Sequence, residues 1–103
     1  MALVVGDLVF QNVGAITAVA ALSVDSTGAV SYSITAGKQG VSFQNVGSKP
    51  AWYGGSTVDP ASSLGNKLFP NQSLTYKNVK TDFVIYFKCA AAETTTIAIV
   101  EHA

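Results

Sequence analysis

The sequence contains no arginine and few charged residues of either sign. Six lysines balance six acidic residues over 103 residues, so the formal net charge at pH 7 is zero. Proteins that bind nucleic acids usually carry a basic face on which arginine is prominent, because phosphate contacts dominate their affinity. The composition therefore predicts that nucleic acid is not a partner.

Cysteine and histidine, which often serve nucleophilic catalysis and metal binding, occur once each. The single cysteine, Cys89, excludes an internal disulfide, and it follows an apolar run, which is typical of a small buried residue. His102 is the penultimate residue, where a frayed chain end is expected. A Cys89–His102 pair would lack a third group to orient the base. We therefore predict no catalytic nucleophile.

The acidic residues are scattered singly, each near a turn or a strand end: Asp7, Asp25, Asp59, Asp82, Glu93 and Glu101. A metal site needs clustered ligands, and glycoside hydrolysis needs a pair of carboxylates. Sheets can bring distant residues together, so spacing alone leaves a carboxylate pair open. We therefore favour a protein that has no catalytic, metal or cofactor site and is not an enzyme.

Long hydrophobic runs are absent as well. No run of eighteen apolar residues exists, and the segment Met1–Gly6 has no basic residues before its short apolar run, so we expect neither a membrane partner nor a signal peptide. Hydrophobic residues nevertheless make up 49% of the chain and charged residues only 12%. A small domain with so little charge is expected to cover part of its surface with a partner. We predict one domain that forms a homo-oligomer or a subunit of a larger assembly.

Short alternating segments separated by turn residues predict an all-β protein. In residues 29–36, Val30, Tyr32 and Ile34 alternate with small polar residues, which is typical of a strand with one solvent-exposed face. Further strands are predicted over these ranges: 14–24, 41–46, 50–53, 73–77, 82–89 and 95–101. About seven or eight short strands without βαβ alternation predict an antiparallel β-sandwich or a jelly-roll-like barrel.

The alanine-rich segment 14–24 is the one place where a helix competes, because alanine favours helices. Its β-branched residues, among them Ile16 and Val19, favour a strand, which we prefer. The turn residues 25–28 follow directly. The segments 14–24 and 29–36 are therefore predicted to pair as a hairpin.

Residues 54–72 form a connection without regular periodicity, which is long for a compact domain and predicts a contact loop. One helical turn is expected within 59–66. Alternation sends either Trp52 or Tyr53 into the core, and leaves the other for a partner. The candidate partner contacts are Trp52, Tyr53, Val58, Leu64, Leu68 and Phe69. Residues 1–10 are either a first strand or an extended arm that pairs with a neighbouring chain.

Three segments around this connection resemble a known family: Asn45-Val46-Gly47, residues 50–58 (PAWYGGSTV) and residues 65–74 (GNKLFPNQSL). They are similar to an "N-x-G, aromatic, G-G-S-x-V, then L-x-P-G-x-S" pattern in small all-β virion proteins of tailed bacteriophages. The resemblance covers residues 45–76, about a third of the chain. Asn71 stands where the pattern usually has glycine, and asparagine also tolerates the left-handed conformation.

The resemblance implies a structural protein of the virion, made in the host cytoplasm and often trimeric. Its partners would be the major capsid protein or other virion proteins. The implied role is that of a capsid decoration or cement subunit, which stabilises the head by bridging neighbouring subunits. The alternative is a tail, collar or fibre module that uses Trp52, Tyr53 and the 54–72 loop to bind another virion protein or a host surface glycan.

Overall fold

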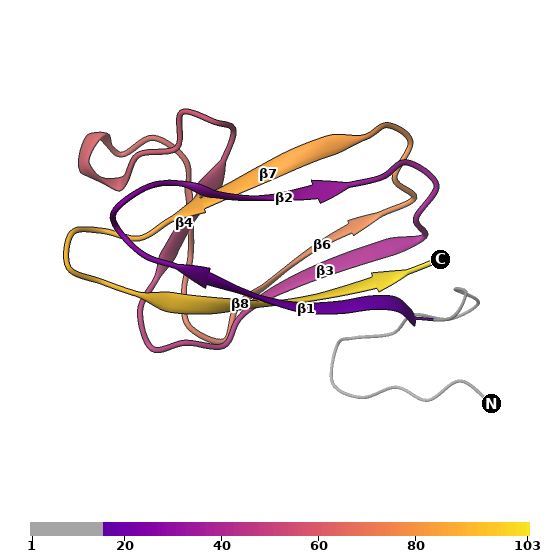
Figure 1. The fold of residues 1–103 in the computed structure, drawn as a ribbon, viewed down its shortest axis with the longest axis horizontal. Helices are drawn as coiled ribbons and strands as arrows, with labels where there is room; N and C mark the ends of the chain where they lie inside the picture. Colours follow the sequence, from indigo (N-terminus) through magenta and orange to yellow (C-terminus); the bar gives the residue numbers. More distant parts are fainter. Residues whose placement is uncertain (1–15) are drawn as a thin grey trace.

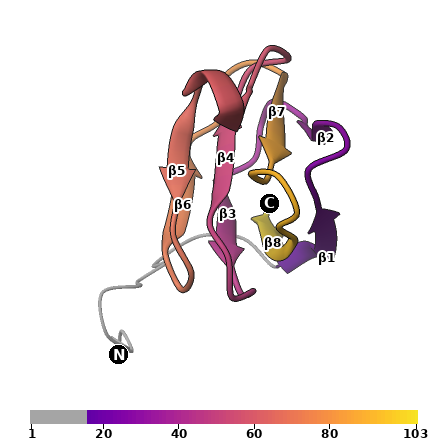
Figure 2. The ribbon, with the colours of Figure 1, turned by 90° about the vertical axis from the view of Figure 1, so that its left-hand side faces the viewer.

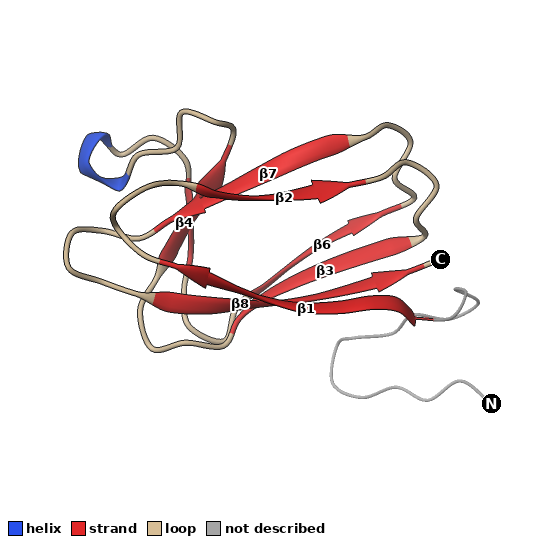
Figure 3. Cartoon of the chain, in the orientation of Figure 1, coloured by secondary structure: helices blue, strands red, loops and turns tan. Residues whose placement is uncertain are grey.

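The computed structural model describes residues 16–103 as two antiparallel four-stranded sheets, shown in Figure 1. The arm predicted at residues 1–10 lies outside the described residues. The strands are β1 (Ile16–Val24), β2 (Val30–Ile34), β3 (Gly40–Asn45), β4 (Ala51–Gly54), β5 (Asn66–Leu68), β6 (Ser73–Lys77), β7 (Phe83–Lys88) and β8 (Thr95–His102). Within 16–103 the helical structure is one 3₁₀ turn, η1 (Pro60–Ser62), drawn in blue in Figure 3. The all-β prediction is confirmed, and the described part of segment 14–24, Ile16–Val24, is a strand as preferred.

The strand order is β1-β8-β3-β6 in one sheet and β2-β7-β4-β5 in the other. Apart from β4 and β5, consecutive strands belong to different sheets, so the chain crosses between the sheets at almost every turn. Figure 2 shows the result: β5 and β6 lie at one edge of the sandwich, and β1 and β2 lie at the other. Eight antiparallel strands wound in this way form a jelly roll, one of the two predicted architectures.

The predicted hairpin of segments 14–24 and 29–36 is wrong. Strand β1 pairs with β8, and β2 pairs with β7 in the opposite sheet. Five residues separate β1 from β2, enough to span the roughly 10 Å between packed sheets. The turn is fixed by Asp25, whose carboxylate accepts bonds from the amide and the hydroxyl of Thr27. Alternation identifies the inner face of a strand but not its partner, which is why the prediction failed.

The core lies between the sheets and follows the predicted alternation. Phe43 on β3 is fully buried, and its ring centroid lies 5.7 Å from that of Phe87 on β7. The rings of Tyr32 and Tyr76 meet Phe43 edge-on, at centroid distances of 6.0 and 6.2 Å. Such pairs add about 0.5–1.5 kcal/mol each beyond the area they bury. One aromatic cluster therefore joins four strands from both sheets.

The connection 54–72, predicted as a contact loop with one helical turn, also contains a strand. Gly54 ends β4, and β5 folds back on β4 with Leu68 opposite Ala51. Between them, Asp59 caps η1, which falls within the range expected for a helical turn. A three-residue strand is too short to show alternation, which is why β5 escaped sequence analysis.

His102 is not at a frayed end. It is the last residue of β8, lies opposite both Ile16 and Gly40, and is only 8% exposed. Cys89 lies at the other end of β1, where its thiol is 3.6 Å from the carbonyl oxygen of Val24. At about 3.3 Å per residue, the nine residues of β1 keep Cys89 and His102 more than 20 Å apart.

The side chain of Asn45, at the end of β3, is fully buried and makes four hydrogen bonds. Its Nδ2 donates to the carbonyl oxygens of Lys49 (2.8 Å) and Leu68 (2.9 Å). Its Oδ1 accepts from the amide of Gly47 (3.0 Å) and the hydroxyl of Thr95 (2.6 Å). An amide side chain has two donor hydrogens and two acceptor lone pairs, so all its capacity is used. We call these five residues the Asn45 network.

The backbone of Asn45 holds a further part of the chain. Its amide donates to the carbonyl of Gln72 at 3.0 Å, and its carbonyl accepts from the amide of Asn71 at 2.7 Å. Asn71 has φ +69°, the left-handed conformation expected where the resembled pattern has glycine. The network also needs Gly47, because a methyl group there would lie 2.0 Å from Thr95 Oγ1. The Asn-x-Gly part of the motif thus has a structural role.

We predict that Asn45→Ala lowers the free energy of unfolding by about 3–5 kcal/mol, because it leaves two carbonyls, an amide and a hydroxyl without their bonds. Chemical denaturation measures the change. Gln44→Ala, an exposed substitution one residue earlier in β3, is the matched control and should change stability by less than about 0.5 kcal/mol. A loss below about 1 kcal/mol for Asn45→Ala would contradict the role assigned to the network.

Candidate functional site

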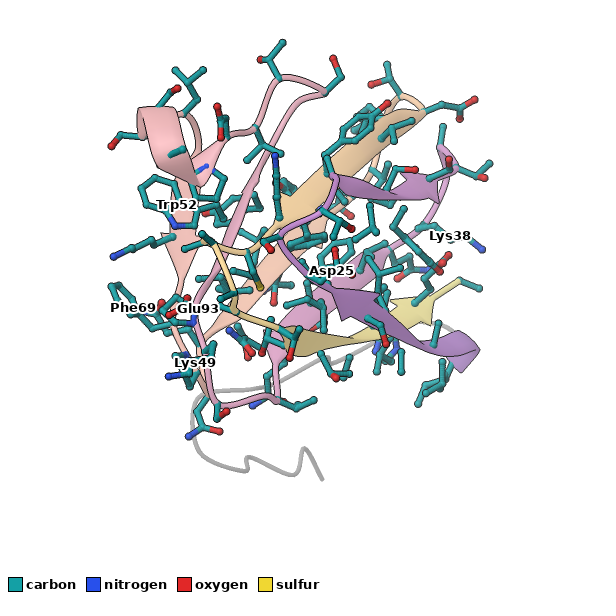
Figure 4. All side chains as sticks on the ribbon, turned by 60° about the vertical axis from the view of Figure 1, so that its left-hand side comes forward. Asp25, Lys38, Lys49, Trp52, Phe69 and Glu93 are labelled. Atoms are coloured by element: carbon teal, nitrogen blue, oxygen red, sulfur yellow. The ribbon has the colours of Figure 1, made fainter. Side chains whose placement is uncertain are left out.

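The outward face of the β2-β7-β4-β5 sheet carries aromatic and basic side chains around Trp52. In the register of the sheet, Trp52 on β4 lies between Lys88 on β7 and Lys67 on β5. Lys67 Nζ is 5.5 Å from the centroid of the Trp52 ring and 5.4 Å from that of Phe69, within cation–π distance of both. Figure 4 shows Trp52 and Phe69 on the same side of the molecule.

Tyr86 extends this group, because it lies opposite Gly54 and Ser31 on the same face of the sheet and is partly exposed. Val84, two residues earlier on β7, is 43% exposed. Neither Val84 nor Tyr86 is among the contact residues predicted from the sequence, although their alternation with Phe83, Ile85 and Phe87 identifies this face of β7. We call the following set the aromatic face: Trp52, Lys67, Phe69, Val84, Tyr86 and Lys88.

The structure separates the six predicted contact residues into two groups. Trp52 is half-buried on the aromatic face, whereas Leu64 and Phe69 are 50% and 46% exposed. Tyr53 points the other way, against the core, with its ring centroid 6.3 Å from that of Phe87. Val58 and Leu68 are only 6% and 4% exposed. Tyr53, Val58 and Leu68 therefore pack on the inner side of the 54–72 connection and offer little surface to a partner.

The outward face of the β1-β8-β3-β6 sheet has a different chemistry. Val19 on β1, Val100 on β8 and Ser42 on β3 form one cross-strand row. A second row runs from Ala21 through Ala98 to Gln44. Among residues 16–103, the lysine on this face is Lys77, the last residue of edge strand β6, which shares a cross-strand row with Gly40 and the buried His102. We call the following set the uncharged face: Val19, Ala21, Ser23, Ser42, Gln44, Ser73, Thr75, Thr96, Ala98 and Val100.

A polar cluster closes the end of the sandwich opposite the Asp25 turn. The hydroxyl of Tyr32 donates to Glu101 Oε2, and Lys38 Nζ lies 3.5 Å from Glu101 Oε1. Glu101 points inward with Ile97 and Ile99 and is only 7% exposed. Burial, together with the bond to Glu101, raises the pKa of Tyr32 to about 12. The Tyr32 hydroxyl is therefore a hydrogen-bond donor at neutral pH rather than a base.

The single cysteine, Cys89, is buried beside the end of β1. Burial raises the pKa of the Cys89 thiol, which keeps it protonated and weakly nucleophilic. Within residues 16–103, no three residues among His, Cys, Asp and Glu are grouped closely enough to hold a metal ion. Over the same range, no helix is both long and apolar enough to cross a membrane.

We predict that stability falls between pH 10 and pH 12 partly because of Tyr32. An unfolded tyrosine loses its proton near pH 10, whereas folded Tyr32 keeps it to about pH 12, so the folded state binds more protons in this window and loses its advantage as pH rises. Tyr32→Phe should remove on the order of 1 kcal/mol of this decline, given the partial exposure of Tyr32 to water. Denaturation at several pH values measures how the free energy of unfolding changes with pH in the wild type and in Tyr32→Phe. Equal slopes between pH 10 and pH 12 would contradict the contribution assigned to Tyr32.

No family model matches the sequence, and no curated protein matches it either. Among solved structures, the chain is similar to one described as "Solution NMR structure of a de novo designed double-stranded beta-helix", with a TM-score of 0.60 and 17% sequence identity. The alignment covers 82% of this chain and 99% of that one. At this identity the likeness shows the fold alone, an all-β architecture that agrees with the strand order.

Proposed function

We propose that the protein is a non-enzymatic structural subunit of a bacteriophage particle, a decoration or cement protein that binds capsid subunits and bridges them. The observation that carries this proposal is the uncharged face. Binding through such a face desolvates few charged groups, and the desolvation of charged groups is one of the costs of association. The rows of small side chains on four paired strands suit contact with another flat protein surface.

The size of the face suggests how it is used. Four strands about 4.8 Å apart and about six residues long present roughly 400 Å² of surface. A contact of this size buries about 800 Å² in total, less than a stable one-to-one complex usually needs. Many copies bound side by side on a particle, or several faces in one oligomer, would raise the overall affinity by multivalency. A repeating lattice of capsid subunits offers such an arrangement.

The assignment to a phage particle is supported by the resemblance over residues 45–76. The contacts of these residues are compatible with such a pattern, since Asn45 and Gly47 take part in the network and Asn71 has a left-handed conformation. Jelly rolls occur in viral capsid proteins, although they also serve lectins and cupins, so the fold is compatible with this role and does not select it.

Gln44→Lys and Ala98→Lys together should reduce binding to heads of the encoding phage by at least tenfold, because they place two charges in the middle of the uncharged face. Cosedimentation of purified protein with heads that lack it measures the binding. Val84→Lys adds a charge on the opposite sheet and should bind like the wild type. Wild-type protein that does not cosediment with heads would overturn the proposal, as would equal loss in the Val84→Lys control.

Recognition of a surface glycan is a second candidate, favoured by Trp52 in the middle of the aromatic face. Aromatic rings stack on sugar rings, and Lys67 and Lys88 could bind acidic substituents. A glycan array probed with the wild type should then show binding that Trp52→Ala abolishes, while Val19→Ala on the other sheet keeps it. An array without signal for the folded wild type would exclude this candidate.

A further inference from the structure

The two edges of the jelly roll are protected unequally against further strand pairing. Edge strands expose unpaired amides and carbonyls, and soluble proteins usually protect them by shortness, lysine, proline or bulges. At one edge, β5 has only three residues and includes Lys67, and β6 ends in Lys77. This edge, shown beside β3 and β4 in Figure 2, has the expected protection.

The other edge, formed by β1 and β2, has almost no such protection against strand pairing. Strand β1 is the longest strand in the described part of the chain, with nine residues, and contains no charged residue and no proline. A register shift between Ile16 and Ala18 is its only irregularity, so Ala18–Val24 is a regular strand. Among residues 16–103, β1 pairs with β8 alone. Its neighbour at this edge, β2, has the uncharged sequence VSYSI.

We infer that the β1 edge binds the β1 edge of a second copy of this chain, antiparallel and around a two-fold axis. A two-fold contact brings each strand against itself, so like charges would oppose each other, and β1 has none. Centring the axis on Ala21 pairs the regular residues Ala18–Val24 with their own copy. The two β1-β8-β3-β6 sheets then form one continuous eight-stranded sheet.

The contact area is that of a weak, reversible dimer. The seven paired residues Ala18–Val24 span roughly 23 Å at about 3.3 Å each, and two packed sheets with their side chains are about 20 Å thick. Edge-to-edge contact therefore covers about 460 Å² on each chain, or about 900 Å² in total, in the size range of weak protein interfaces. Main-chain hydrogen bonds along β1 add to this, as in other cases of strand addition.

Dimerisation also changes the surface that serves the proposed function. The uncharged faces of the two chains lie on the same side of the joined sheet, so the dimer doubles the face that we propose for capsid binding. The contact is two-fold, in contrast to the trimer that the resemblance implies. The inference rests on the proposed function for its biological meaning, but the two can fail separately, because a dimer can form that does not bind heads.

Sedimentation equilibrium of the full chain should give twice the 10.6 kDa chain mass. Ala21→Lys puts two like charges opposite each other at the axis and should weaken the dimer at least tenfold. Gln44→Lys, in the middle of the uncharged face, is the matched control and should leave the dimer intact. Circular dichroism checks that both variants fold.

Ala21→Cys should form a disulfide-linked dimer on mild oxidation, since paired residues across antiparallel strands have Cβ atoms about 4.5–5.5 Å apart. Wild-type protein should not, because Cys89 is only 1% exposed. A monomeric full chain would overturn the inference and mean that something else covers the edge, either another part of this chain or a different protein. A trimer, or a dimer lost in Gln44→Lys but kept in Ala21→Lys, would overturn it too.

Discussion

The buried amide of Asn45 is the interaction on which the arrangement of the loops depends. It lies at the point where β3 ends, β8 begins and β5 ends, and it bonds to a backbone or side-chain group of each neighbouring segment. A buried amide is costly unless every donor and acceptor is paired, so the site accepts only one arrangement of the surrounding chain. The network therefore selects one conformation of the turns rather than simply adding stability.

The outer faces of the two sheets, which lie away from these turns, differ in their side-chain chemistry. Most charged residues lie in the turns and at strand ends, where Asp25 and Asp59 bond to neighbouring groups of their own turns. The strands then carry aromatic and basic side chains on one outer face and small uncharged ones on the other. The few charged residues are therefore unevenly distributed: one outer face has lysines beside aromatic rings, whereas the other outer face and strand β1 carry almost no charge.

Alternation alone predicted most strands and the direction of their side chains. Along the predicted strand 41–46, for example, Val41, Phe43 and Asn45 occupy alternate positions, and all three are buried. Strand partners could not be predicted, because a turn such as 25–29 fits both a hairpin and a crossing between sheets. The choice between Trp52 and Tyr53 also needed the structure: Ala51 is buried opposite Leu68, and Tyr53 shares its inward direction. Val58 and Leu68 looked like contact residues because β5 was too short to recognise.

Native-state hydrogen exchange tests the central role of Asn45 most directly. The amides of Asn45, Gly47 and Asn71, which bond to Gln72, to the Asn45 side chain and to the Asn45 carbonyl, lie in or beside loops. If the network organises the fold, these three amides exchange only through global unfolding, as slowly as amides in the middle of β8. Exchange as fast as that of the Thr27 amide, which makes a similar bond to Asp25 in an exposed turn, would contradict the account.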